Sequence, residues 1–386
     1  MAYTSAAPEI STHQLAQALE SGEPVQVVDV RAPAQVAAGH IDIVPDGRFH
    51  NIVGSQLVKV TRVAGTAIDP SLPVTVVCGH GNDSKLLAHH LNRLGFRANS
   101  LAGGMSAWMM LALPRELATP PSLDRLIQFD RIGKGALGYL LVSGGEALIV
   151  DPPRNPRAYL EAAAEAGAGV VGVADTHVHA DYISGASTIA TTLGVPYYLH
   201  PADAVYPYDG TPGRLQFEPL ADGDTIPFGR SSVHVVHTPG HTEGSLTYVI
   251  DDAVALTGDF IFVGSVGRPD LAGKVREWTA QLWESLERAK REWPPDRMIY
   301  PAHYGSDAER RADRAVGECF GQILEANEAM QFSDPDAFAR WVESKTVSFP
   351  EAYRRIKAVN VGLLPVDGRQ AEELEVGKNE CALGGR

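Results

Sequence analysis

Short apolar runs alternate with helix-compatible stretches in the first third of the chain. Residues 25–30 (VQVVDV) and 74–78 (VTVVC) are rich in β-branched side chains, and each run leads through polar or glycine-rich residues into such a stretch. Continuous apolar runs of this length are typical of strands buried in a parallel sheet. The pattern predicts a small α/β domain with a parallel sheet, which closes at residues 101–114 (LAGGMSAWMMLALP).

A second series of strands begins after a polar stretch with adjacent prolines, residues 115–124 (RELATPPSLD). Such a stretch marks a linker, and we place the domain boundary near residue 118. Beyond it strands and helices alternate, and polar groups cluster where the strands end. From about residue 306 the pattern is mostly helical. We therefore expect domains at residues 1–118 and 119–386, the second with a C-terminal helical extension.

Composition narrows the class of protein. A chain of 386 residues exceeds what one hydrophobic core usually holds, and its 44% hydrophobic and 21% charged residues suit a fully folded protein. The formal net charge of −14 argues against a nucleic-acid partner. No apolar run of about 18 residues and no signal-peptide pattern occurs, which favours a cytoplasmic protein without a membrane partner. The helical extension leaves a homo-oligomer open.

The cysteines are Cys78, Cys319 and Cys381, too few and too scattered for a disulfide framework, which fits a reducing compartment. We expect Cys319 and Cys381 to be structural or incidental, and Cys381 could be exposed near the C-terminus. Cys78 differs because it leaves an apolar strand and enters a glycine-containing loop before a helix. Backbone N–H groups at a helix N-terminus stabilise a thiolate or an anion. The alternative interpretation is that Cys78 is simply a small buried apolar residue.

Four motifs of the first domain resemble a rhodanese domain: VVDVR at residues 27–31, AGHI at 38–41, the Cys-x-x-Gly-x-x-Ser loop at 78–84, and LAGGMSAW at 101–108. The resemblance implies that Cys78 carries a sulfane sulfur as a persulfide, and Ser84 is a candidate substrate-binding residue of its loop. Asp29 and Arg31 would hold the scaffold together.

The cysteine loop departs from rhodaneses that act on thiosulfate, which often carry arginine or another cation there. Its residues are Gly79, His80, Asn82 and Asp83. An aspartate repels a bound dianion, although a charged His80 would partly compensate. We therefore expect a persulfide as sulfur donor, or transfer from the neighbouring domain. A non-catalytic module for sulfur sensing or docking is the alternative.

The second domain carries histidines and carboxylates in four clusters. They are His177, His179 and Asp181 in THVHADY, His241 in HTPGHTEGS, Asp259 in LTGDF, and His303 in YPAHYG. Residues at the ends of neighbouring strands can converge on one point, because such strands lie about 5 Å apart. Any one of these histidines is more often a hydrogen-bonded loop residue, but the whole set indicates a metal.

Residues 121–305 resemble the metallo-β-lactamase fold, an αββα sandwich. In that superfamily the first motif usually reads His-x-His-x-Asp-His, and the last histidine helps to hold a second metal. Tyr182 stands at that position here. A neutral phenol is a poor replacement for imidazole, so a binuclear zinc site is disfavoured.

Within this superfamily, persulfide dioxygenases bind one Fe(II) through two histidines and one aspartate. The matching positions here are His177, His241 and Asp259. Such a set leaves positions open for a sulfur ligand and O₂. The resemblance implies that the neighbouring residues orient ligands or hydrogen-bond water. They are His179, Asp181, Tyr182 and His303.

Residues 258–271 (GDFIFVGSVGRPDL) also look like the segment that follows the aspartate ligand in those enzymes. Arg268 in this segment is a candidate to hold a carboxylate of the thiol carrier. A surface ion pair is the alternative for this arginine.

The two resemblances together imply a persulfide dioxygenase fused to a sulfurtransferase. It would oxidise a low-molecular-weight thiol persulfide, such as glutathione persulfide, with O₂ to sulfite and thiol. Cys78 would supply persulfide or combine sulfane sulfur with sulfite to give thiosulfate. Spacing alone leaves a mononuclear zinc hydrolase of thioesters or lactones open, similar to glyoxalase II, with His179 completing a three-histidine site.

Overall fold

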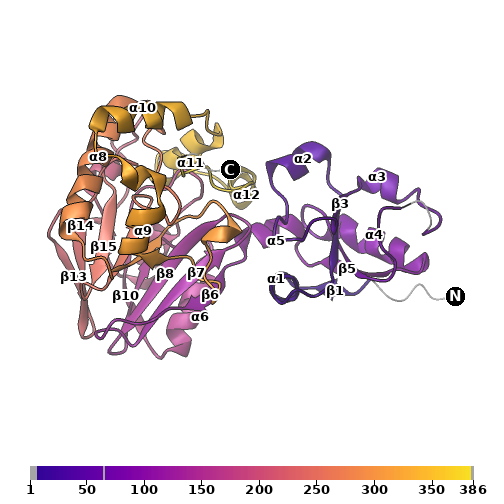
Figure 1. The fold of residues 1–386 in the computed structure, drawn as a ribbon. Coiled ribbons are helices and arrows are strands. Elements are labelled where there is room, and N and C mark those ends of the chain that lie inside the picture. The colour runs from indigo at the N-terminus through magenta and orange to yellow at the C-terminus, as the bar shows by residue number, and fades with distance from the viewer. Residues whose placement is uncertain (1–6, 64–65, 384–386) are drawn as a thin grey trace. The chain divides into compact units, whose positions relative to one another are not determined.

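The computed structural model describes residues 7–63 and 66–383, which form two compact units (Figure 1). The first unit runs to Leu113 and also includes Arg131–Lys134 and Val376–Lys378. The second contains Pro114–Asp130, Gly135–Glu375 and the residues from Asn379 onward. None of the described helices combines the length and the apolar composition needed to cross a membrane.

A five-stranded parallel sheet in the order β1-β5-β4-β2-β3 forms the centre of the first unit. Its strands are β1 (Glu9–Ile10), β2 (Gln26–Asp29), β3 (Phe49–Asn51), β4 (Pro73–Val77) and β5 (Arg97–Leu101). The helices are α1 (Thr12–Glu20), α2 (Pro33–Ala38), α3 (Gly54–Leu57), α4 (Asn82–Arg93) and α5 (Gly104–Met110).

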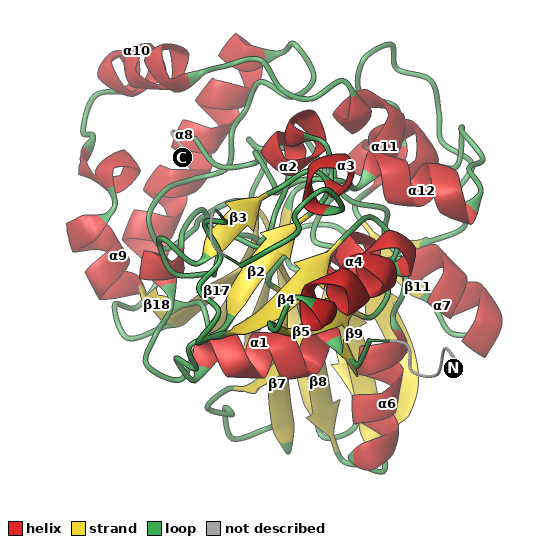
Figure 2. Cartoon of the chain, turned by 90° about the vertical axis from the view of Figure 1, so that its right-hand side faces the viewer, coloured by secondary structure: helices red, strands yellow, loops and turns green. Residues whose placement is uncertain are grey.

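Helices cover both faces of this sheet, because successive strand residues point to opposite sides. Val27 and Val77 pack with apolar residues of α1 and α5. Their chain neighbours Val28 and Val76 pack with residues of α3 and α4 on the other face. Figure 2 shows α1 and α4 beside β2, β4 and β5. This arrangement confirms the predicted α/β domain with a parallel sheet.

Two further sheets form the second unit. The seven-stranded sheet, in the order β12-β11-β10-β9-β8-β7-β6, consists of β6 (Leu113–Glu116), β7 (Arg125–Arg131), β8 (Ala136–Ser143), β9 (Glu146–Val150), β10 (Gly169–Ala174), β11 (Tyr197–Leu199) and β12 (Glu218–Pro219). The six-stranded sheet follows chain order and consists of β13 (Thr225–Phe228), β14 (Ser231–His237), β15 (Leu246–Ile250), β16 (Val254–Gly258), β17 (Met298–Pro301) and β18 (Glu318–Cys319).

The helices of this unit pack on the outer faces of the two sheets and on loops at the strand ends. They are α6 (Arg157–Glu165), α7 (Ala186–Leu193), α8 (Val275–Glu292), α9 (Phe320–Ala326), α10 (Pro335–Lys345), α11 (Ala352–Asn360) and α12 (Gly368–Leu374), with short 3₁₀ turns at Pro201–Ala204, Asp307–Glu309 and Glu328–Gln331.

Alternation along β14 shows how the layers form. Val233 and Val235 point into the core between the sheets, while Val236 packs outward with residues of α8, α9 and α10. Helix α8 appears in orange beside β14 and β15 in Figure 1, and α10 packs against α8. Helices α6 and α7 pack on β8, β10 and β11 of the other sheet. The predicted αββα sandwich with a C-terminal helical extension is confirmed.

Candidate metal centre and substrate cavity

The three predicted metal residues lie at or shortly beyond the carboxyl ends of strands. His177 follows β10, His241 follows β14, and Asp259 follows β16. Gly258, the last residue of β16, has a φ of 55°, and a Cβ atom at this position would lie 2.5 Å from Oγ1 of Thr176. Glycine is therefore required for the strand that carries Asp259 to approach the loop that carries His177.

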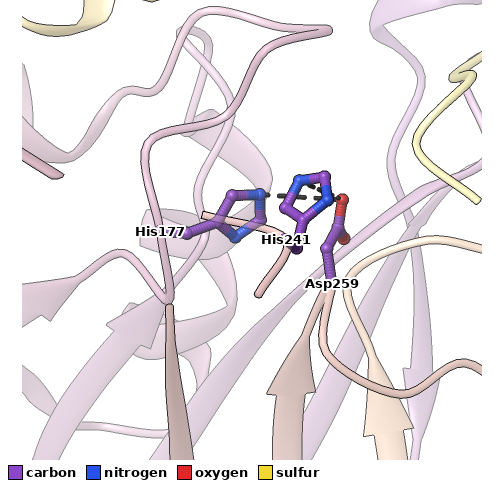
Figure 3. Close-up of side chains that lie close together, drawn as sticks. All are labelled: His177, His241 and Asp259. Atoms are coloured by element: carbon purple, nitrogen blue, oxygen red, sulfur yellow. Dashed lines mark ion pairs between the residues drawn. The ribbon is translucent and has the colours of Figure 1, made fainter. Parts of the chain in front are cut away.

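The side chains of His177, His241 and Asp259 converge in the interior (Figure 3). Oδ2 of Asp259 lies 3.6 Å from Nε2 of His177 and 3.3 Å from Nε2 of His241. All three side chains are buried, and none of these three atoms has a hydrogen-bond partner among the described residues. Buried polar atoms normally have partners, so three converging atoms without one fit a bound cation.

Neighbouring groups orient both imidazole rings toward this point. Oγ1 of Thr176 donates a hydrogen bond to Asp151 (2.9 Å) and lies 3.0 Å from Nδ1 of His177, where it can accept. Nδ1 of His241 lies 3.0 Å from the carbonyl oxygen of Arg268 and donates to it. With the protons on Nδ1, the lone pair of each Nε2 points toward the carboxylate of Asp259.

The charge states suit a metal. Burial lowers the pKa of His177 well below its usual value and that of His241 to about 4, so both rings are neutral at pH 7. Burial opposes ionisation of Asp259, but the charge of His303 and a hydrogen bond from it lower the pKa of this carboxyl. Neutral imidazole and ionised carboxylate are the forms that bind metals.

His303 lies between two carboxylates. Its Nδ1 is 2.6 Å from Oδ1 of Asp259 and its Nε2 is 3.1 Å from Oδ2 of Asp181. Burial disfavours the charged ring, but the two carboxylates raise the pKa of His303 to about 10. A charged His303 therefore occupies one oxygen of Asp259 and leaves the other facing the two histidines.

Tyr182 contacts the remaining histidine of the first motif. Its hydroxyl lies 2.8 Å from Nε2 of His179, the rings stack with centroids 4.3 Å apart, and the same Nε2 is 3.1 Å from Oδ1 of Asp151. Burial raises the pKa of Tyr182 well above its usual value, so the phenol stays neutral. Nδ1 of His179 has no hydrogen-bond partner among the described residues.

A cavity of about 310 Å³ lies next to the convergence point. Its wall includes Val178 and Thr242, which follow His177 and His241 in the chain, together with the aromatic rings of Tyr206, Tyr208 and Trp278. Lys357 of α11 also lines it. The cavity thus lies beside the loops that carry His177 and His241, and its aromatic side chains can contact a small organic molecule.

In the first unit, the loop before α4 surrounds the sulfur of Cys78. The N–H groups of Gly81 and Ser84 donate to Sγ at 3.1 and 3.4 Å, and Oγ of Ser84 lies 3.2 Å from it. Gly104 has a φ of 59°, and a Cβ atom there would lie 2.4 Å from the Cys78 carbonyl oxygen. The side chain is buried in the structure, and the surrounding donors suit a negatively charged sulfur.

Asp29 and Arg31 form a buried ion pair of 2.6 Å, and the guanidinium also donates to the carbonyl oxygen of Gly39. These contacts connect the end of β2 to the end of α2. They agree with the scaffold role predicted for this pair.

The metallo-beta-lactamase superfamily matches residues 133–310, and the rhodanese-like domain matches residues 11–111. A hydroxyacylglutathione hydrolase of Acidiphilium cryptum is 38% identical over 178 residues, which cover 46% of this chain and 68% of that protein. The chain belongs to the metallo-beta-lactamase superfamily. Its N-terminal unit is a rhodanese domain.

Two further members of the superfamily resemble this one. The human mitochondrial persulfide dioxygenase ETHE1 is 31% identical over 164 residues, which cover 41% of this chain and 59% of ETHE1. A crystal structure of a metallo-beta-lactamase from Staphylococcus aureus matches with a TM-score of 0.52 and 28% identity, covering 60% of this chain and 70% of that one. The superfamily member described here is thus related to both a hydrolase and a dioxygenase.

Arg268, predicted to bind substrate, lies in the interior of this metallo-beta-lactamase domain. Its guanidinium donates to Asp270 at 2.7 and 2.6 Å and also to the carbonyl oxygens of Val347 and Glu380. The ion pair considered as the alternative is therefore present, but it is buried and not on the surface. A contact between Arg268 and substrate stays a prediction.

Sequence reasoning missed three residues near the metal centre, all from the C-terminal part. Lys357 lines the cavity, and Asn360 donates to the carbonyl oxygens of His179 and Tyr182 at 2.9 and 2.8 Å. Cys381 is buried, not exposed, and lies in a cluster with Asp181 and His303. The signal for the first two was a polar residue on the apolar face of α11, which buries Tyr353, Ile356 and Lys357 at helical spacing.

Proposed function

We propose that this chain is a persulfide dioxygenase coupled to a sulfurtransferase. The observation that carries the proposal is the convergence of two neutral imidazoles and one carboxylate, His177, His241 and Asp259, in a buried centre beside a cavity. Two histidines and one carboxylate suit a mononuclear Fe(II) site. The relation to ETHE1 and the rhodanese domain in the same chain both support a persulfide as substrate.

The proposed reaction converts one thiol persulfide, one O₂ and one water into one thiol, one sulfite dianion and two protons. The sulfane sulfur loses four electrons, which O₂ accepts, and the sulfur–sulfur bond is broken. When bound, Fe(II) supplies the one-electron chemistry that lets O₂ oxidise a sulfur anion.

The remaining tasks belong to the side chains. His177, His241 and Asp259 would hold the metal, while Thr176 and the Arg268 carbonyl oxygen keep both imidazole rings in the required orientation. The charged His303 keeps Asp259 ionised and directs one of its oxygens inward. The cavity would hold the thiol carrier, with glutathione as the first candidate.

In the rhodanese domain, Cys78 would accept a sulfane sulfur. Its thiol and a carrier persulfide would give a Cys78 persulfide and the carrier thiol, with no change in net oxidation. The N–H groups of Gly81 and Ser84 support this role because they stabilise a negatively charged sulfur. Sulfite could then take the sulfur from Cys78 as thiosulfate.

Oxygen consumption tests the dioxygenase directly. We expect anaerobically iron-loaded protein to consume O₂ on addition of glutathione persulfide, with uptake proportional to the iron measured in the same sample. Asp259→Ala should lower the rate by about a hundredfold or more, because ligand loss removes the metal. The variant Asp336→Ala, which removes an exposed carboxylate on α10, should keep the rate. An iron-replete sample that consumes no O₂ with several persulfides would refute the proposal.

A mononuclear zinc hydrolase of thioesters or lactones is the second candidate. Nδ1 of His179 lacks a hydrogen-bond partner among the described residues and could act as a third histidine ligand. The hydroxyacylglutathione hydrolase of Acidiphilium cryptum supports this function by its relation to the chain. It predicts bound zinc, hydrolysis of acyl-glutathione, no oxygen uptake, and a rhodanese domain that serves as a sulfur-sensing or docking module.

A further inference from the structure

Lys357 is a buried lysine. Burial lowers the pKa of its side chain, and the charges of Asp203, Asp259 and Asp181 counteract this effect. Its side chain is 1% exposed, and its ammonium group makes no hydrogen bond or ion pair with any residue that the structure describes. Buried arginines of the same unit differ, since Arg268 pairs with Asp270 and Arg310 pairs with Asp130. A buried charge without a partner is unfavourable, so such a residue is retained where it serves a ligand.

Lys357 lies near the loops of the metal centre. It lines the cavity together with Val178 and Thr242, and its charge contributes to lowering the pKa of both His177 and His241. The part of a ligand that Lys357 contacts is therefore close to the point where the reaction takes place.

Three carboxylates line the cavity, and each has partners other than Lys357. Glu243 pairs with Lys274 at 3.5 Å, and Asp209 accepts a hydrogen bond from the N–H of Thr211 at 2.9 Å. Asp203 accepts hydrogen bonds from the N–H groups of Val178 and Gly244 and from the hydroxyl of Thr242, at 2.7, 2.8 and 2.9 Å. It fixes the two loops that carry His177 and His241, and it does not pair with Lys357. The ammonium group therefore remains available to an anion that enters the cavity.

We infer that Lys357 binds the anionic sulfur of the substrate and the sulfur oxyanion formed from it. A persulfide anion and sulfite are both negatively charged and can pair with this ammonium group, whereas a thioester is neutral at its reacting group. The identity of the anion rests on the proposed dioxygenase function. The existence of an anion site rests only on the burial and position of Lys357.

Calorimetric titration with sulfite tests the inference without any turnover. Full-length protein with Cys78→Ser is used so that no persulfide at residue 78 reacts with sulfite, and it is titrated after metal removal by a chelator. We expect Lys357→Met to weaken sulfite binding by about tenfold or more, the effect of losing one charge-assisted hydrogen bond. Arg355→Met, which removes an exposed charge from the same helix, should change the affinity by less than about twofold.

Acetate serves as the carboxylate comparator. Acetate should bind more weakly than sulfite. Equal binding that also depends on Lys357 would assign the residue to a carboxylate of the carrier and overturn the sulfur assignment. Unchanged sulfite affinity in Lys357→Met, or no sulfite binding by the parent protein, would overturn the anion site itself.

Stability and oxygen uptake complete the test. Lys357→Met should melt at the same temperature as the parent or higher, because it removes an unpaired buried charge. If the Lys357→Met variant does not fold, the Lys357→Gln variant is used in its place. Oxygen uptake by iron-loaded protein tests the proposed dioxygenase function, and sulfite binding by metal-free protein tests the anion site. Either result can be negative without the other, so the two experiments separate this inference from the proposed function.

Discussion

At the scale of single residues, Tyr182 distinguishes this site from the binuclear centres of its superfamily. Its neutral phenol contacts Nε2 of His179 and stacks on that ring. Nearby, Asp181 contacts His303, whose other nitrogen contacts Asp259. Asp181 and His303 lie together with Cys381, but the phenol at position 182 replaces the imidazole that helps to hold a second metal in the superfamily.

Tyr182→His should therefore raise the metal content. Reconstituted with zinc, the parent protein is expected to bind about one metal per chain, and the variant nearer two, since imidazole is a good zinc ligand. Mass-spectrometric metal analysis after removal of unbound metal measures the ratio.

Tyr182→Phe is the control, because it removes the hydroxyl without adding a ligand. It should keep about one metal per chain. A parent protein that already binds two metals would contradict the role given to Tyr182, and so would a Tyr182→His variant whose ratio stays at one.

At the scale of elements, α11 supports the loop that carries the first metal motif. The amide group of Asn360 donates to the carbonyl oxygens of His179 and Tyr182 and accepts from the N–H of Ser184. Glu375, just after α12, accepts from the N–H of Ile183. The C-terminal helices thus satisfy backbone groups of a loop that has no sheet partner for them.

Asn360→Ala should destabilise the protein by about 2–3 kcal/mol, because three partly buried backbone groups lose their partner. Urea denaturation followed by circular dichroism measures this change. Arg355→Ala, at an exposed position of the same helix, should cost less than about 0.5 kcal/mol. Equal midpoints for both variants would show that Asn360 does not support the loop.

Whether a residue of the site could be predicted from the sequence depends on the element that carries it. The fold and the grouping of His177, His241 and Asp259 could be predicted because each residue lies at or shortly beyond the end of a strand with a clear local pattern. The position of α11 depends on packing between distant segments, and no local pattern shows which loop a helix will reach. Lys357 and Asn360 were visible as polar residues on an apolar helix face, but their target was not.

At the scale of the whole molecule, each of the two units bears a candidate site, and the proposed function assigns sulfur chemistry to both. Proximity in one chain raises the effective concentration of a shared intermediate. If both sites handle the same sulfane sulfur, sulfite made by one unit can react with the persulfide held by the other. This chemical coupling between the two sites can be tested by analysing the reaction products.

Cys78→Ser should change the products without abolishing oxygen uptake. Supplied with glutathione persulfide and O₂, the parent protein is expected to give sulfite and thiosulfate, and Cys78→Ser mainly sulfite, because its hydroxyl cannot carry sulfane sulfur. Ion chromatography quantifies both products after subtraction of the reaction without protein. Cys319→Ser, at a partly exposed cysteine, is the matched control. Unchanged products and rates in Cys78→Ser would contradict the coupling.

The pairing of the C-terminal segment with the metal domain bears on how the protein matures. The N–H of Arg268 donates to the carbonyl oxygen of Cys381, and the N–H of Leu383 donates to that of Val266. The segment that orients His241 therefore gains its partners only after residue 383 has been synthesised. On the ribosome, metal binding by His177, His241 and Asp259 is therefore expected to wait until translation of these residues is complete.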